Sequence, residues 1–133
     1  MEQIRDILGR PVTEYDGGLT FRWEPGAVHV EFSSGRQQKI SYRRRDDFYT
    51  FESIVAAPRV VRRLGQTEVA RQILAWNRTT DVVGFTLDGR RRIVAWSERR
   101  AAALQAEELR FYLAVLATEA DRFEFLLTGK DER

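Results

Sequence analysis

The chain has 133 residues, 43% of them hydrophobic, with no cysteine and a single histidine, His29. This length predicts one compact domain spanning residues 1–133, and the missing cysteines and lone histidine exclude disulfides, thiolate catalysis and multi-histidine or sulfur-ligated metal sites. No run of about 18 apolar residues and no basic-then-apolar leader occurs, so we expect a soluble cytoplasmic protein without a membrane segment.

The net charge of +2 conceals a separation of charge along the chain. Residues 1–35 carry three basic against six acidic side chains, and residues 101–133 carry four against seven, whereas residues 36–100 carry fifteen against seven. This pattern predicts a basic surface for an anionic partner, or acidic and basic elements that meet within the fold or across an oligomer.

The first half of the chain predicts a short helix followed by a β-meander. In the first ten residues the apolar side chains fall at helical spacing ahead of Gly9. Period-two alternation then predicts four antiparallel strands separated by turn residues. The predicted strands are residues 19–24, 28–32, 37–45 and 48–57. Pro58 ends the last strand, because proline cannot donate to the sheet ladder.

Residues 58–65 predict about one turn of helix between Pro58 and Gly65, and residues 66–77 predict a helix with one buried side. Its apolar stripe comprises Val69, Ala70, Ile73, Leu74 and Trp76, and Asn77 is the expected left-handed cap.

The last part of the chain predicts a β-hairpin and a long helix. Asp88-Gly89 is a strong two-residue turn signal between alternating strands. A long amphipathic helix follows over residues 105–127. The order of elements therefore predicts an α+β fold: helix, antiparallel strands, helix, hairpin, helix.

The motifs that carry chemistry are missing from the sequence. It contains no glycine-rich phosphate loop, no GxSxG elbow, no HExxH and no calcium-binding loop. His29 lies on the polar side of a predicted strand without a partner nucleophile, so we expect an ordinary surface histidine. We predict no catalytic, cofactor or metal site.

Two surfaces are candidates for partner binding. Phe111, Val115 and Phe125 project from the side of the long helix opposite its main stripe, and either form a second contact surface or are covered by a loop or by the first helix. The arginines Arg43, Arg45, Arg91 and Arg92 either grip single-stranded nucleic acid beside stacking aromatics or protect the ends of hairpins.

The segments "ILAWNRTTDVVGFTLDGRRRIVAW" and "LQAEELRFYLAVLATEADRFEFLLTG" resemble the C-terminal half of the YbjN family. The element order resembles the fold that this family shares with the class I type III secretion chaperones. The resemblance implies a noncatalytic, often dimeric domain that holds extended or partly unfolded polypeptide. These domains are commonly acidic, and the basic middle section of this chain departs from that pattern.

Because the chaperones that it resembles pair through their middle helix and adjoining strand, we predict a homodimer with contacts at Ala70, Leu74 and Trp76. Phe111 and Val115 form the alternative dimer surface. The predicted function is a protein- or peptide-binding adaptor, chaperone-like or regulatory domain without a cofactor. The alternative is a protein that binds single-stranded nucleic acid through the arginine-rich middle section.

Overall fold

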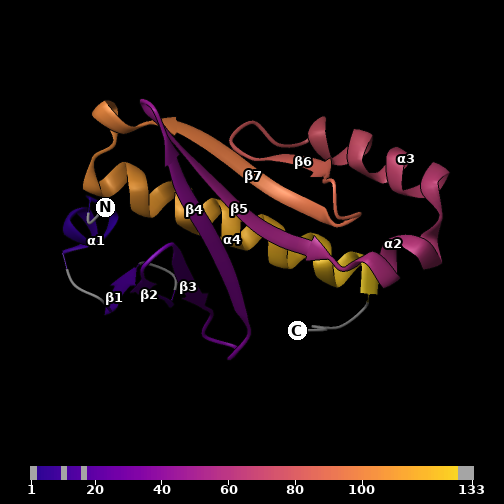
Figure 1. Cartoon of the computed structure of the whole chain (residues 1–133). Coiled ribbons are helices and arrows are strands. Elements are labelled where there is room, and N and C mark those ends of the chain that lie inside the picture. The colour runs from indigo at the N-terminus through magenta and orange to yellow at the C-terminus, as the bar shows by residue number, and fades with distance from the viewer. Residues whose placement is uncertain (1–2, 10–11, 16–17, 129–133) are drawn as a thin grey trace.

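The computed structural model describes residues 3–9, 12–15 and 18–128, with only the backbone described for 12–15. The described residues form an antiparallel sheet of seven strands with a long helix along one face (Figure 1). The elements are α1 (Gln3–Leu8), β1 (Val12–Tyr15), β2 (Leu19–Glu24), β3 (Ala27–Glu31), β4 (Gln37–Arg45), β5 (Phe48–Ala56), α2 (Pro58–Leu64), α3 (Gln66–Asn77), β6 (Gly84–Leu87), β7 (Ile93–Arg100), a 3-10 turn (Ala101–Ala103) and α4 (Ala106–Thr128).

The strand order is β1-β2-β3-β4-β5-β7-β6, and every neighbouring pair is antiparallel. The predicted α+β class, the antiparallel meander and the long final helix are confirmed. The return strand β7 lies between β5 and β6, so the hairpin joins the meander in one continuous sheet. Strand β1 was not predicted, and the meander therefore has one strand more than the sequence pattern indicated.

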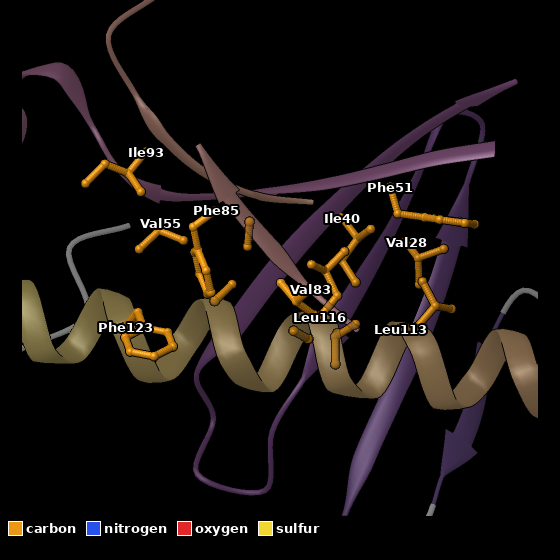
Figure 2. Packing of buried hydrophobic residues seen from close by; sticks show 14 of the residues in the cluster. Val28, Ile40, Phe51, Val55, Val83, Phe85, Ile93, Leu113, Leu116 and Phe123 are labelled. Atoms are coloured by element: carbon orange, nitrogen blue, oxygen red, sulfur yellow. The ribbon is translucent and has the colours of Figure 1, made fainter. Parts of the chain in front are cut away.

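The core lies between the inward face of the sheet and α4. Figure 2 shows sheet side chains such as Val28, Ile40 and Phe85 turned toward the helix. The helix contributes most of the face that its periodicity predicts: Leu109, Leu113, Leu116, Ala120 and Phe123 are buried, whereas Tyr112 and Leu127 of the same stripe are only partly buried. Each fully buried side chain of this size contributes about 1.5–3 kcal/mol through the removal of apolar surface from water.

The predicted apolar stripe of α3 is divided between the core and the surface. Val69 and Trp76 are buried, and the Trp76 ring lies 4.3 Å from Phe123 and 5.3 Å from Phe85 between ring centroids. Ala70 and Leu74 face outward, and Leu74 is 56% exposed. Ile73 is partly buried and packs against the core. The broad stripe is therefore not one surface, because Val69, Ile73 and Trp76 face the core and Ala70 and Leu74 face outward.

The prediction that Asn77 is a left-handed cap was wrong. The helix runs through Asn77, and the following Arg78 has a right-handed φ of −79°. The Asn77 side chain instead accepts a hydrogen bond from the backbone N–H of Phe85 at 2.8 Å and donates one to the Phe85 carbonyl at 3.1 Å. Asparagine can do both because its amide carries a donor and an acceptor.

The predicted two-residue turn at Asp88-Gly89 is a longer loop. Leu87 pairs with Ile93, which leaves five residues between the strands, and the left-handed position is Arg91 with a φ of 61°. The Asp88 carboxylate accepts the backbone N–H groups of Arg90 and Arg92 at 2.9 Å and pairs with the Arg92 guanidinium. Burial raises the pKa of Asp88, but these hydrogen bonds outweigh that effect and hold the pKa below its usual range.

Candidate partner-binding site

The side of α4 that the sequence marked as a second apolar surface forms one wall of a groove. Phe111 and Phe125, 47% and 48% exposed, lie along this wall with Val115 between them. The groove has a volume of about 870 Å³. Its lining residues are Leu19, Phe32, Arg36, Phe111, Ala114, Val115, Thr118, Glu119, Asp121, Arg122, Phe125 and Leu126. We refer to it as the α4 groove.

The opposite wall comes from the meander, and the sequence analysis did not anticipate it. Leu19 begins β2 and Phe32 follows β3, and both belong to the apolar alternation of the predicted strands 19–24 and 28–32. A tight turn holds Phe32, because its N–H donates to the Arg36 carbonyl at 2.9 Å and its carbonyl accepts from Gly35 at the same distance. The alternation of apolar residues predicted the sheet face on which the two residues lie. It did not predict that this face extends beyond the part that α4 covers.

An ion pair joins the two walls. Arg36, in the turn between β3 and β4, donates to the carboxylate of Asp121 on α4 at 2.5 Å, and its guanidinium lies 5.8 Å from the Phe125 ring centroid. Asp121 is only 6% exposed, and the Arg36 guanidinium supplies a charged partner for its buried carboxylate. The pair holds the meander turn at a set distance from the helix.

A buried polar chain reinforces the same junction. Gln38 of β4 donates to the Glu124 carboxylate of α4 at 2.7 Å, and Ser53 of β5 donates to the Gln38 amide oxygen at 2.8 Å. Buried polar groups that are paired in this way restrict side chains to one arrangement. The walls of the α4 groove are therefore preorganised. The sequence features that could have indicated this are Gln38 at an inward position of a strand, and Asp121 and Glu124 on the buried side of a helix.

The predicted contacts on α3 occupy different environments. Ala70 and Leu74 are exposed on the outer side of the helix, whereas Trp76 is buried against Phe85 and Phe123 and is not part of that surface. The neighbouring edge of β6 is partly closed, because Asn77 binds both backbone groups of Phe85 and Thr80 donates to the Val83 carbonyl at 2.6 Å. A strand from another chain could not pair with β6 at these positions without displacing those side chains.

The four predicted anion-binding arginines do not form one site. Arg43 and Arg45 lie at the end of β4 beside the start of β5, whereas Arg91 and Arg92 lie in the turn between β6 and β7. The length of β5 separates the two pairs, because the eight residue steps from Phe48 to Ala56 span about 26 Å. Arg92 is also paired with Asp88, at 2.7 Å.

His29 lies on the sheet face opposite α4, between Arg22 and Lys39 in the cross-strand register. Its Nε2 is 2.5 Å from a carboxylate oxygen of Glu24, and the pair is partly exposed. His29 is therefore a partly exposed side chain of the sheet surface, as the sequence indicated. Within the part of the chain that the structure describes, no helix is long and apolar enough to cross a bilayer.

Comparison with solved structures shows that the chain has the type III secretion chaperone fold. It is similar to a chain of the ExsC–ExsE complex, with 19% identity over 94% of this chain and 88% of the other at a TM-score of 0.57. The ExoU–SpcU complex of Pseudomonas aeruginosa gives 19% identity, coverage of 79% and 85%, and a TM-score of 0.56.

A third similar structure is the Yersinia pestis type III secretion chaperone SycH in complex with a stable fragment of YscM2. It gives 15% identity, coverage of 92% and 94%, and a TM-score of 0.53. No protein-family model matches the sequence, and no curated protein matches it. The likeness therefore establishes the fold that the element order had suggested.

Proposed function

We propose that this protein is a noncatalytic, chaperone-like adaptor that binds an apolar segment of a client polypeptide in the α4 groove. The observation that carries the proposal is a preorganised groove whose exposed wall consists of Phe111, Val115, Phe125 and Leu126. The similar solved structures support it, because each of them is a complex of two proteins. The resemblance of residues 66–129 to the YbjN family remains a prediction.

The apolar wall would supply most of the affinity. A phenylalanine side chain buries about 150–250 Å² when fully covered, and about half of this remains exposed on Phe111 and Phe125. At about 25 cal/mol per Å², covering the exposed half of each ring contributes at most about 2–3 kcal/mol. The charged rim, with Arg122 and Glu119, carries both positive and negative side chains. It would fix the position of the client and add little to the affinity.

The test is binding of a fluorescein-labelled peptide of alternating leucine and serine, measured by anisotropy. F111Q/F125Q should weaken binding at least tenfold, since a tenfold loss needs only about 1.4 kcal/mol. The matched control is I54T/L87T, which removes two side chains of comparable exposure outside the groove. Equal losses in the two variants, or no loss in the first, would contradict a site in the α4 groove.

The homodimer also belongs to this proposal, with Ala70 and Leu74 on α3 as its contacts. Both are exposed, and a closed two-fold pair is the commonest way to cover such a surface. Trp76 is buried in the core and would not contact a second copy. In this proposal Phe111 and Val115 contact the client. In sedimentation, wild type should be dimeric at tens of micromolar and L74E monomeric. Q66E adds the same charge at the exposed start of α3 and should stay dimeric.

A further inference from the structure

Five arginines gather where the ends of β4 and β7 meet the start of β5. The strand register places Arg45, Phe48 and Arg100 in one cross-strand row, and Arg44, Tyr49 and Arg99 in the next. We refer to Arg43, Arg44, Arg45, Arg99 and Arg100 as the arginine end. In Figure 1 the turn between β4 and β5 and the end of β7 lie together, far from the turn between β6 and β7.

Aromatic rings support three of these guanidinium groups. Arg99 lies 4.0 Å from the Tyr112 ring centroid, Arg100 lies 5.0 Å from that of Phe48, and Arg44 lies 5.8 Å from that of Tyr49. A guanidinium group that rests on a ring is oriented before it meets a ligand, and its N–H fork matches the geometry of a carboxylate. The arrangement lowers the entropy that binding an anion would otherwise cost.

The arginine end has two faces. Arg44 and Arg99 lie on the helix side of the sheet, where Arg44 donates to the side-chain oxygen of Gln3 at 3.2 Å and Arg99 donates to the Glu98 carbonyl at 2.8 Å. Arg43, Arg45 and Arg100 lie on the opposite face and are exposed. These three are the groups that an approaching partner would meet first.

None of the five arginines forms an ion pair with a described residue. Some arginines elsewhere in the described chain do pair with carboxylates, as Arg36, Arg71, Arg92 and Arg122 do. On the exposed face Glu98 lies two residues from Arg100 on β7 and Glu52 lies diagonally across from Arg43 on β5, but neither carboxylate pairs with these arginines. Asp46 and Asp47 follow in the turn between β4 and β5. The guanidinium groups of this face therefore have no carboxylate partner among the described residues and can pair with one from outside.

We propose that the exposed face of the arginine end binds an acidic segment of a polypeptide partner. Arg43 and Arg45 lie two residues apart on one strand, so their Cα atoms are about 7 Å apart. Alternate residues of an extended peptide have the same spacing, so two acidic side chains on one side of it can each meet an arginine. Arg100 lies about 10 Å across the sheet from Arg45 and can take a third carboxylate.

The rings at this end favour a carboxylate ligand over nucleobases. Proteins that hold single strands stack bases on open aromatic faces. Here Phe48 is covered by Arg100 and Tyr112 by Arg99, and Tyr49 is only 1% exposed. The inference shares with the proposed function only the premise that the partner is a polypeptide, because none of these residues lines the α4 groove.

The probe is a fluorescein-labelled peptide of about twelve residues in which glutamate and serine alternate, long enough to span the sheet face. Anisotropy is measured at about 0.15 M salt, where exposed charges more than about 8 Å apart are largely screened. R43Q/R45Q/R100Q should bind at least tenfold more weakly than wild type, the loss expected from removing three charge-assisted contacts. R62Q/R63Q/R90Q removes the same charge from other exposed positions and should bind within about twofold of wild type.

Three results would overturn the proposal. The first is absence of binding by wild type, and the second is an equal loss in the two triple variants, which would mean that net charge alone attracts the peptide. The third is tighter binding of oligothymidine of the same length that is lost in R43Q/R45Q/R100Q, which would make this face a nucleic-acid site. The leucine-serine peptide serves as the internal comparison, because its binding tests the α4 groove and should be unchanged in both triple variants.

Discussion

Replacing Asn77 by alanine should destabilise the protein and open the edge of its sheet. Asn77 is the last residue of α3, and its amide binds both the N–H and the carbonyl of Phe85 in the edge strand β6. In the variant these two backbone groups lose their partners, and α3 retains the packing of Trp76 on Phe85 as a link to the strand. An edge with free backbone groups is also a template for another strand.

The magnitude follows from two hydrogen bonds at a partly buried edge. A net contribution of about 0.5–1.5 kcal/mol for each bond gives a loss of about 1–3 kcal/mol in the free energy of unfolding. Water can reach part of this edge, which places the expected value near the middle of that range, about 2 kcal/mol. For a chain of this length such a loss lowers the Tm by about 6–10 °C.

Urea unfolding followed by tryptophan fluorescence measures the change, since Trp76 adjoins the altered position in the chain. The control is R78A, which removes an exposed side chain from the next residue and should change stability by no more than about 0.5 kcal/mol. Light scattering should show that N77A associates more readily than R78A. If N77A were as stable as R78A, the inference that Asn77 holds β6 through two hydrogen bonds would be refuted.

Three other variants test the packing and the hairpin. Folding lowers the pKa of Asp88, so its charge stabilises the fold above the unfolded pKa of about 4. This contribution is lost as the pH falls through the lower folded pKa. The free energy of unfolding should therefore fall less steeply with decreasing pH in D88N than in wild type. In G84A the new Cβ would lie 3.0 Å from the Trp96 ring, and urea unfolding should show a loss of about 1–3 kcal/mol that W96A relieves. F123A should lose about 3–5 kcal/mol and change the near-ultraviolet dichroism of Trp76, whose ring it contacts; an unchanged spectrum would contradict that packing.

The sequence by itself determined the kinds of elements and most of their limits. Period-two alternation located β2 to β5, and helical periodicity located α3 and α4. These patterns arise because the backbone geometry of a strand or a helix decides which side chains share its buried face. Most of the buried face of α4 was predictable for the same reason, although the buried Asp121 and Glu124 were not part of the predicted stripe. The exposure of Phe111 and Phe125 could also be predicted, since both project from the side of the helix opposite its main apolar stripe.

Local pattern was insufficient wherever a side chain's role depends on a distant partner. Trp76 and Leu74 are both apolar residues of one helix, and only the position of α4 decides that the first is buried and the second exposed. Asn77 has the composition of a helix cap, but the edge of β6 offers its amide two better partners. The short β1 has too few residues for alternation to distinguish it from a loop.

The arginine end shows the same limit for function. In sequence Arg91 and Arg92 are closer to Arg99 and Arg100 than Arg43 and Arg45 are. Because β5 pairs with both β4 and β7, however, it is Arg43 and Arg45 that lie beside Arg99 and Arg100. Strand register is set by the burial of one whole sheet face against α4, and a shift by one residue would turn every core side chain outward. The sequence therefore determined that arginines follow these strands, whereas the tertiary structure alone decided which of them share a surface.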